Sequence, residues 1–179
     1  GYGGRAILND PAPPPAADVV VLESTYGDRR HKALEPSLDE LYDVVNRTMK
    51  RGGNVIIPTF AVERAQEVLY YLREGIEAGR LEHYVNVFLD SPMAISATHV
   101  FERHPECFDA EMLDRAAGGD PFGLPSLHFT RETAASMALN QVQSGALIMA
   151  GSGMCTGGRV RHHLRHNLWR RECAVVFVG

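Results

Sequence analysis

The chain has 179 residues, of which 45% are hydrophobic and 22% are charged, and its formal net charge is -4. A chain of this length and composition buries a substantial core, so intrinsic disorder, collagen and a coiled coil are excluded. No run of about 18 apolar residues is present, which excludes a membrane-spanning helix. No basic stretch precedes an apolar one, so a secretory signal is not visible.

Strand and helix patterns alternate along the chain after a proline-rich start. Residues 1–17, which include Pro13-Pro14-Pro15, are expected to form an extended linker, and residues 18–179 a domain. The expected strands are residues 18–22, 54–58, 85–89, 127–129, 147–150 and 174–178. The expected helices are residues 37–49, 62–76, 92–104, 107–117, 130–143 and 160–168. This alternation predicts an α/β fold in three layers, with a mostly parallel sheet covered by helices on both faces.

Capping signals support three of the helix starts. Ser37 and Glu40 have the spacing of a capping box, and Ser91 followed by proline is typical of an N-cap. Thr130 is expected to cap the helix that follows it. Each of these residues predicts a helix boundary without implying any function.

Polar motifs follow four of the expected strands, at residues 23–27, 59–64, 90–92 and 151–159. In a parallel sheet the carboxyl ends of the strands share one edge, where ligands bind. A cap or a turn explains each motif alone, but together the motifs predict a site. Glu23 ends an apolar run, so its carboxylate is expected to be partly buried there, which is typical of functional groups; a hydrogen-bonded cap of the next turn is the other interpretation.

The glycine-rich run from Gly151 to Arg159 lies between a strand and a helix. Free backbone N–H groups and a positive helix end in such a loop hold a phosphate or sulfate. The run lacks the Gly-Lys pair of a P-loop, and Thr156 stands where a dinucleotide-binding fingerprint needs its third glycine. A nucleotide- or phosphometabolite-binding module and a flexible turn packed on the helix both stay open.

Positive charge gathers in the last part of the chain. Residues 159–179 carry five arginines and one glutamate, a balance of +4, whereas the preceding residues carry -8. On the expected helix, the apolar side is formed by Val160, Leu164 and Leu168. The opposite, cationic side is formed by Arg159, His162, His163 and His166, flanked by Arg161 and Arg165. Such a stripe fits a polyanion, and a solvated helix face is the alternative.

No metal site is expected within this sequence. His162 and His166 have the spacing of a helical metal pair, but no glutamate stands at position 163 and the neighbouring residues are cationic. The three cysteines (Cys107, Cys155 and Cys173) form no Cys-x-x-Cys pair, which favours a reducing, cytoplasmic setting without disulfides. The chain begins at Gly1 without an initiator methionine, so we expect it to be a segment of a longer protein.

Four motifs, taken together and in this order, resemble a known family. They are LESTYGDR at residues 22–29, IPTFAVERAQE at 57–67, LDSPM at 89–93 and SGMCTGGR at 152–159. These motifs are similar to those of the β-CASP domain, which is inserted in metallo-β-lactamase-fold nucleases that process RNA, relatives of the mRNA 3′-end endonuclease. The resemblance spans nearly the whole chain.

The resemblance implies a lid domain that holds single-stranded RNA over a catalytic site in the protein's own metallo-β-lactamase domain. It implies two zinc ions, whose ligands fall outside this sequence because the family's His-x-His-x-Asp-His set is absent here. The segment alone is therefore expected to be inactive. Glu23 matches the family's motif A acidic position. The alternative to an RNA-processing enzyme is a DNA-directed member of the same family. We expect RNA or phosphate contacts from Arg64, Ser152, Gly153, Thr156, Gly157, Gly158, Arg159, Arg161 and Arg165.

Overall fold

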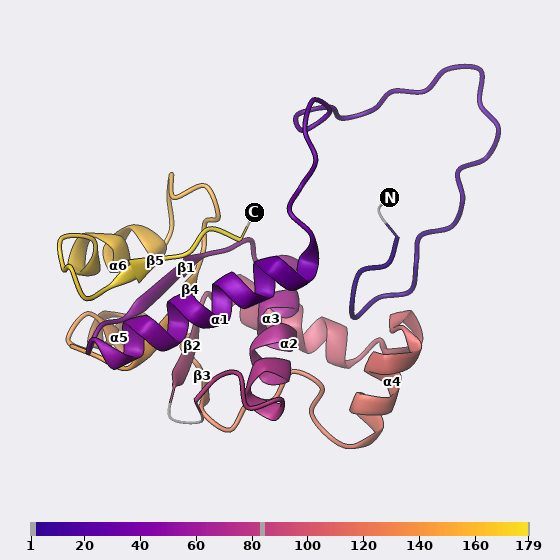
Figure 1. Ribbon diagram of the computed structural model, residues 1–179. Helices are drawn as coiled ribbons and strands as arrows, with labels where there is room; N and C mark the ends of the chain where they lie inside the picture. Colours follow the sequence, from indigo (N-terminus) through magenta and orange to yellow (C-terminus); the bar gives the residue numbers. More distant parts are fainter. Residues whose placement is uncertain (1–2, 83–84, 179) are drawn as a thin grey trace.

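A five-stranded sheet forms the centre of the computed structural model, which describes residues 3–82 and 85–178. Residues 1 and 2 of the expected linker, and residue 179, lie outside the described residues. The strand order is β3-β2-β4-β1-β5, and every pair is parallel. The predicted α/β fold with a parallel sheet is therefore confirmed (Figure 1).

The elements follow one another in the predicted alternation. The strands are β1 (Val55–Pro58), β2 (Asn86–Asp90), β3 (Leu127–Phe129), β4 (Ala146–Ala150) and β5 (Ala174–Val175). The helices are α1 (Leu34–Lys50), α2 (Arg64–Glu77), α3 (Pro92–Glu102), α4 (Ala110–Ala117), α5 (Thr133–Leu139) and α6 (Val160–Asn167), with a short 3-10 turn at Pro105–Cys107.

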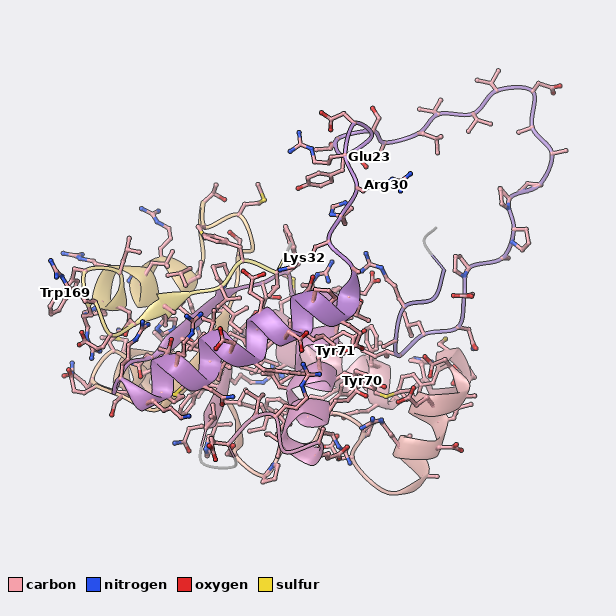
Figure 2. All side chains as sticks on the ribbon, viewed as in Figure 1. Glu23, Arg30, Lys32, Tyr70, Tyr71 and Trp169 are labelled. Carbon is pink, nitrogen blue, oxygen red and sulfur yellow. The ribbon has the colours of Figure 1, made fainter. Side chains whose placement is uncertain are left out.

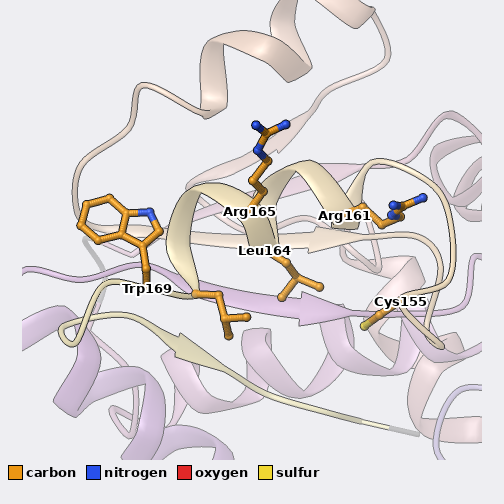
Figure 3. A pocket seen from close by; sticks show the side chains of 6 residues that line it. Cys155, Arg161, Leu164, Arg165 and Trp169 are labelled. Atoms are coloured by element: carbon orange, nitrogen blue, oxygen red, sulfur yellow. The ribbon is translucent and has the colours of Figure 1, made fainter.

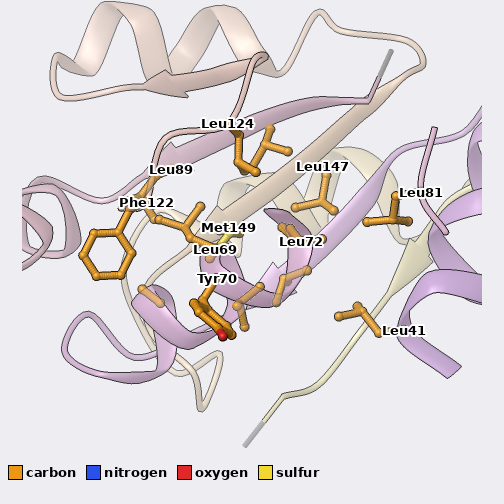
Figure 4. Close-up of a cluster of buried hydrophobic side chains, with 14 of the residues drawn as sticks. Leu41, Leu69, Tyr70, Leu72, Leu81, Leu89, Phe122, Leu124, Leu147 and Met149 are labelled. Atoms are coloured by element: carbon orange, nitrogen blue, oxygen red, sulfur yellow. The ribbon is translucent and has the colours of Figure 1, made fainter. Parts of the chain in front are cut away.

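The two faces of the sheet are covered by different helices. Residues of β1, β2 and β4 that point to one face pack against α1, α2 and α3, and this side holds the larger apolar cluster (Figure 4). Alternate residues of the same strands, such as Ile56 and Ile148, point to the other face and pack against Leu139 of α5 and Val160 of α6. Helices on both faces of one sheet make the three layers.

The expected strand at residues 18–22 is wrong for this structure. These residues are extended but unpaired, and the side chains of Val19, Val20, Val21 and Leu22 are 79%, 68%, 92% and 79% exposed. Their apolar run is typical of a strand buried on both faces, but no neighbouring strand lies beside them among the described residues. The sheet therefore begins with β1.

Residues 10–33 leave the body of the molecule as one exposed segment (Figure 1). The segment is fixed at its start, where Leu8 pairs with Phe108 in an antiparallel bridge and the Ile7 side chain is buried. At its far end it leads directly into α1. Both ends of the segment are thus held by the folded part of the chain.

Two capping predictions are wrong and one is confirmed. The first helix begins at Leu34, before Ser37, whose hydroxyl donates to the Ala33 carbonyl at 2.9 Å instead of accepting from the backbone. The helix after β3 begins at Thr133, so Thr130 does not cap it. Ser91 does cap α3, because its hydroxyl oxygen accepts from the Ala94 N–H at 3.2 Å. Within the described residues, no helix is long and apolar enough to cross a membrane.

Candidate nucleic-acid interface

Three loops meet where the central strands β2, β4 and β1 end. They are residues 59–63 after β1, Asp90 at the end of β2 with Ser91 after it, and residues 151–159 after β4. The Thr59 N–H donates to the Ala150 carbonyl at 3.0 Å, and the Phe60 ring lies against Gly153, where a Cβ atom would come within 2.8 Å of it. Three of the four polar motifs therefore share one edge of the sheet, as predicted.

The glycine-rich loop is closed on its own backbone. Gly158 has a φ of +73, and a Cβ atom there would lie 2.3 Å from the Gly151 carbonyl oxygen, so only glycine fits this position. The Val160 and Arg161 N–H groups, at the start of α6, donate to the Gly151 and Gly158 carbonyls at 3.0 and 3.4 Å. In this conformation those N–H groups are not free for a phosphate.

A buried carboxylate ties this loop to the end of β2. Asp90 is fully buried and accepts from the Arg159 guanidinium at 2.8 Å. Its other oxygen lies 2.6 Å from His163 Nε2 and accepts from the Ser136 hydroxyl at 2.6 Å. The cluster of Asp90, Ser136, Arg159 and His163, called here the Asp90 cluster, joins β2, α5 and α6.

The environment of Asp90 keeps it ionised. Burial, the largest single influence, raises the pKa of the Asp90 carboxyl, but the hydrogen bonds from His163, Ser136 and Arg159 and the charge interaction with His163 together outweigh it, so the pKa lies below its ordinary value of 3.8. Arg159 also donates to the Thr130 and Arg131 carbonyls, each at 2.8 Å. Both terminal nitrogens of the Arg159 guanidinium are thus engaged in hydrogen bonds within the protein.

Helix α6 buries only part of the side predicted: Val160 is buried and Leu164 packs partly buried against the same cluster. Its buried residues are Val160, His163 and Asn167, while Leu168 is 70% exposed. His163 faces inward because Asp90 accepts its ring hydrogen bond, and Asn167 faces inward because its Oδ1 accepts from the Asn54 side chain at 3.0 Å. Buried polar pairs, together with the apolar contacts of Val160 and Leu164, set the rotation of the helix.

The predicted contact residues do not all come together. Ser152, Gly153, Thr156, Gly157, Gly158 and Arg159 share the loop after β4, and Arg161 and Arg165 follow on the exposed side of α6. Arg64 starts α2 and forms an ion pair with Glu67 at 2.7 Å.

Glu23 lies apart from these loops, on the exposed segment (Figure 2). The expectation that it is partly buried at the sheet edge is wrong for this structure, because the strand that would carry it there is not formed. Its Oε1 accepts from the Thr25 N–H at 2.7 Å. Hydrogen bonds from the side chain and the backbone of Thr25 hold the pKa of Glu23 below its ordinary value, so the carboxylate is charged at neutral pH.

A shallow groove of about 510 Å³ runs along α6 (Figure 3), lined by Cys155, Arg161, Leu164, Arg165, Leu168 and Trp169. Trp169, the single tryptophan of the chain, is 77% exposed at one end of it. The sequence pattern predicts the two arginines near this region but does not single out Trp169. An aromatic residue directly after an arginine-rich helix was the signal that could have identified it.

None of the described parts of the chain, residues 3–82 and 85–178, contains a group of three or more His, Cys, Asp or Glu side chains that could hold a metal ion. His162 and His166 are exposed on α6, while His163, between them, is buried. The described residues therefore contain no metal centre.

Comparison with known proteins decides the family. Residues 65–179 match the model of the Beta-Casp domain, which covers well over half of the chain. The chain belongs to the Beta-Casp domain family. The resemblance stated from the four motifs is therefore confirmed.

Relatives of this Beta-Casp domain include RNA-related proteins of bacteria and archaea. The chain is 41% identical over 176 residues to ribonuclease TTHA0252 of Thermus thermophilus, which covers 98% of this chain and 40% of that protein. It is 34% identical over 169 residues to transcription termination factor FttA of Methanocaldococcus jannaschii, covering 92% of this chain and 26% of that protein. The chain thus spans between a quarter and two fifths of the length of these relatives.

Proposed function

We propose that this Beta-Casp domain is the RNA-contacting lid of a metal-dependent ribonuclease. The observation that carries the proposal is the 41% identity to ribonuclease TTHA0252 over 98% of the chain. The cationic side of α6, next to the loops at the carboxyl ends of β1, β2 and β4, supports contact with a polyanion. In this proposal residues 1–17 link the domain to a metallo-β-lactamase domain, and the protein acts inside the cell.

The proposal assigns the metal to another part of the protein. Because the described residues provide no set of ligands for a metal ion, the two zinc ions that the family implies would be held by the metallo-β-lactamase domain. The segment of residues 1–179 is accordingly proposed to be inactive by itself.

The exposed apolar run supports a partner domain on residues 18–22. Four consecutive apolar side chains, each at least 68% exposed, cost free energy in water, and burying them against another domain would recover about 25 cal/mol per Å². We propose that the metallo-β-lactamase domain covers this run. Packing of that kind would bring Glu23, the next residue, to the edge of the catalytic domain, where its charge supports the site.

The role of Glu23 is tested by Glu23→Gln in the full-length protein. We expect RNA cleavage to fall by about tenfold or more, as for the loss of an ionised group that supports a catalytic site, while RNA affinity changes little. Asp18→Asn is the matched control, because Asp18 lies on the same exposed segment. Equal cleavage by the wild type and Glu23→Gln would remove Glu23 from the proposal.

The substrate class is tested by binding. Saturable binding of a mononucleotide by the protein, without affinity for RNA, would favour the phosphometabolite-binding alternative over a nuclease. The closed backbone of residues 151–158 and the paired N–H groups of α6 argue against that alternative. Preferential cleavage of single-stranded DNA would favour the DNA-directed branch.

A further inference from the structure

The groove along α6 carries a feature that loop contacts with phosphates do not explain. Trp169 and Leu168 are 77% and 70% exposed, although exposure of their apolar surface to water is unfavourable. Leu164 continues this apolar floor between them and Cys155 (Figure 3). An exposed indole beside an apolar floor is typical of a ligand-binding or interaction surface.

The charges around the groove are of one sign. Arg161 and Arg165 line it, and no acidic residue does. Among the described residues neither guanidinium pairs with a carboxylate, in contrast to Arg170, which donates to Glu172 at 3.0 Å. The two arginines lie one helical turn apart on α6, about 6 Å along its axis. Their donors face solvent and are available to an anionic ligand.

These charges decide between two possible occupants. A second copy of the chain would meet this groove with the same groove in a two-fold dimer, so that arginines from both copies would face each other. A single-stranded nucleic acid instead offers phosphates to the arginines and flat bases to the indole, the combination found in single-strand binding grooves. Charge complementarity therefore favours the nucleic acid.

We propose that the α6 groove is a binding site for single-stranded RNA, in which a base stacks on Trp169 while Arg161 and Arg165 contact phosphates. This inference rests on the proposed function and adds to it the position of the strand. The groove runs from Cys155, in the loop at the carboxyl edge of the sheet, to Trp169 just beyond the other end of α6. A bound strand would thus lead from the carboxyl edge of the sheet along the helix.

Stacking is tested in the full-length protein with a fluorescent oligouridylate and with the same oligomer made abasic, both in EDTA so that neither is cleaved. Trp169→Ala should raise the Kd for the oligouridylate by about tenfold, because base stacking is lost. It should leave the Kd for the abasic oligomer within about twofold, because phosphate contacts remain. Trp169→Phe should restore most of the affinity.

Phosphate contact is tested with Arg161→Ala and Arg165→Ala. Each should weaken binding of both oligomers and reduce the slope of log Kd against log salt by about one. Lys50→Ala is the matched control: Lys50 is exposed at the end of α1, on the opposite face of the sheet. All these side chains are exposed, so unchanged thermal unfolding is expected for every variant.

Binding and cleavage measured together distinguish a wrong binding groove from a wrong nuclease function. If the protein cleaves RNA and Trp169→Ala binds the oligouridylate as the wild type does, the groove is not the binding site, although the nuclease proposal stands. If polyglutamate competes as well as the oligouridylate, the groove recognises charge alone and the stacking site is overturned. If the wild type neither binds nor cleaves RNA, both proposals fail.

Discussion

The two faces of the sheet are held together in different ways. The face under α1, α2 and α3 is filled by large apolar side chains, such as Leu69, Leu72 and Phe122 (Figure 4). The face under α5 and α6 has a smaller apolar cluster, in which β4 contributes Ala146 and Ala150 beside Ile148. Small side chains bury little apolar area, so this face depends on buried hydrogen bonds to a greater degree.

Those hydrogen bonds centre on two residues at opposite ends of the strands. Asp90 holds Arg159, His163 and Ser136 at the carboxyl edge. Asn54, just before β1, binds Asn167 of α6, the Val142 carbonyl at 2.8 Å and the Ala146 N–H at 3.1 Å. The apolar face therefore provides most of the buried apolar side chains, whereas the hydrogen bonds of the polar face help to fix the position and rotation of α6, the helix that carries the proposed RNA groove.

The largest expected loss in the free energy of unfolding comes from Asp90→Ala, on the polar face. Its removal leaves the Arg159 guanidinium and the buried His163 ring without their carboxylate, and breaking a buried ion pair costs about 3–5 kcal/mol in the free energy of unfolding. Denaturant unfolding measures the loss. Asp109→Ala is the matched control on the other face, where loss of the cap on Met112 N–H should cost about 1 kcal/mol. Equal losses would mean that the polar face has no special dependence on its buried charge.

A smaller effect is expected from a matched pair on β1. Ile56 points to the polar face and Ile57 to the apolar face, and both are fully buried. Ile56→Val and Ile57→Val each delete one methylene, so each should cost about 1 kcal/mol in the free energy of unfolding. Near-equal losses would mean that the two faces differ in hydrogen bonding and not in apolar packing. A much smaller loss for Ile56→Val would mean that apolar side chains pack more loosely on the polar face.

The smallest effect is expected in the pH dependence of stability. The lowered pKa of Asp90 gives stability that is present above pH 3.8 and is lost as the pH falls through the lower folded value. Burial raises the pKa of Glu74, on the apolar face, above 4.5, so its contribution is present at low pH and is lost as the pH rises through that raised value.

Asp90→Asn should therefore reduce the fall in Tm that the wild type shows as the pH drops below 3.8. Glu74→Gln should reduce the fall in Tm that begins as the pH rises above 4.5. Each change in Tm is expected to be about 2 °C or less. Thermal unfolding followed across the acid range gives both limbs. A steeper acid limb in Asp90→Asn than in the wild type would contradict the sign given for Asp90.

The fold could be predicted from the sequence because its signals are local. Apolar runs such as residues 55–58 and 146–150 identify central strands wherever they occur, and their alternation with amphipathic helices restricts the topology to a parallel sheet. The run at residues 18–22 gave the same local signal but pairs with no strand among the described residues. A strand pattern reports that a segment should be buried, not which surface buries it.

The site could be predicted only in part. The position of the loops at the carboxyl edge follows from the direction of parallel strands, so residues 59, 90 and 152 were placed correctly. The rotation of α6 could not be predicted, because histidine and asparagine are seldom fully buried. His163 and Asn167 are buried here because they bind Asp90 and Asn54, which are far away in the sequence. The groove beside Trp169 follows from that rotation.

The exposed segment at residues 10–33 also determines how the chain responds to a protease. It contains Arg29, Arg30 and Lys32, and its backbone lies outside the sheet and the helices. Trypsin would cut here first. The first fragment would stay attached after the cut, because Ile7 remains buried and Leu8 remains paired with Phe108. A domain seated on residues 18–22 would shield the same bonds, so the rate of nicking reports directly whether that surface is covered.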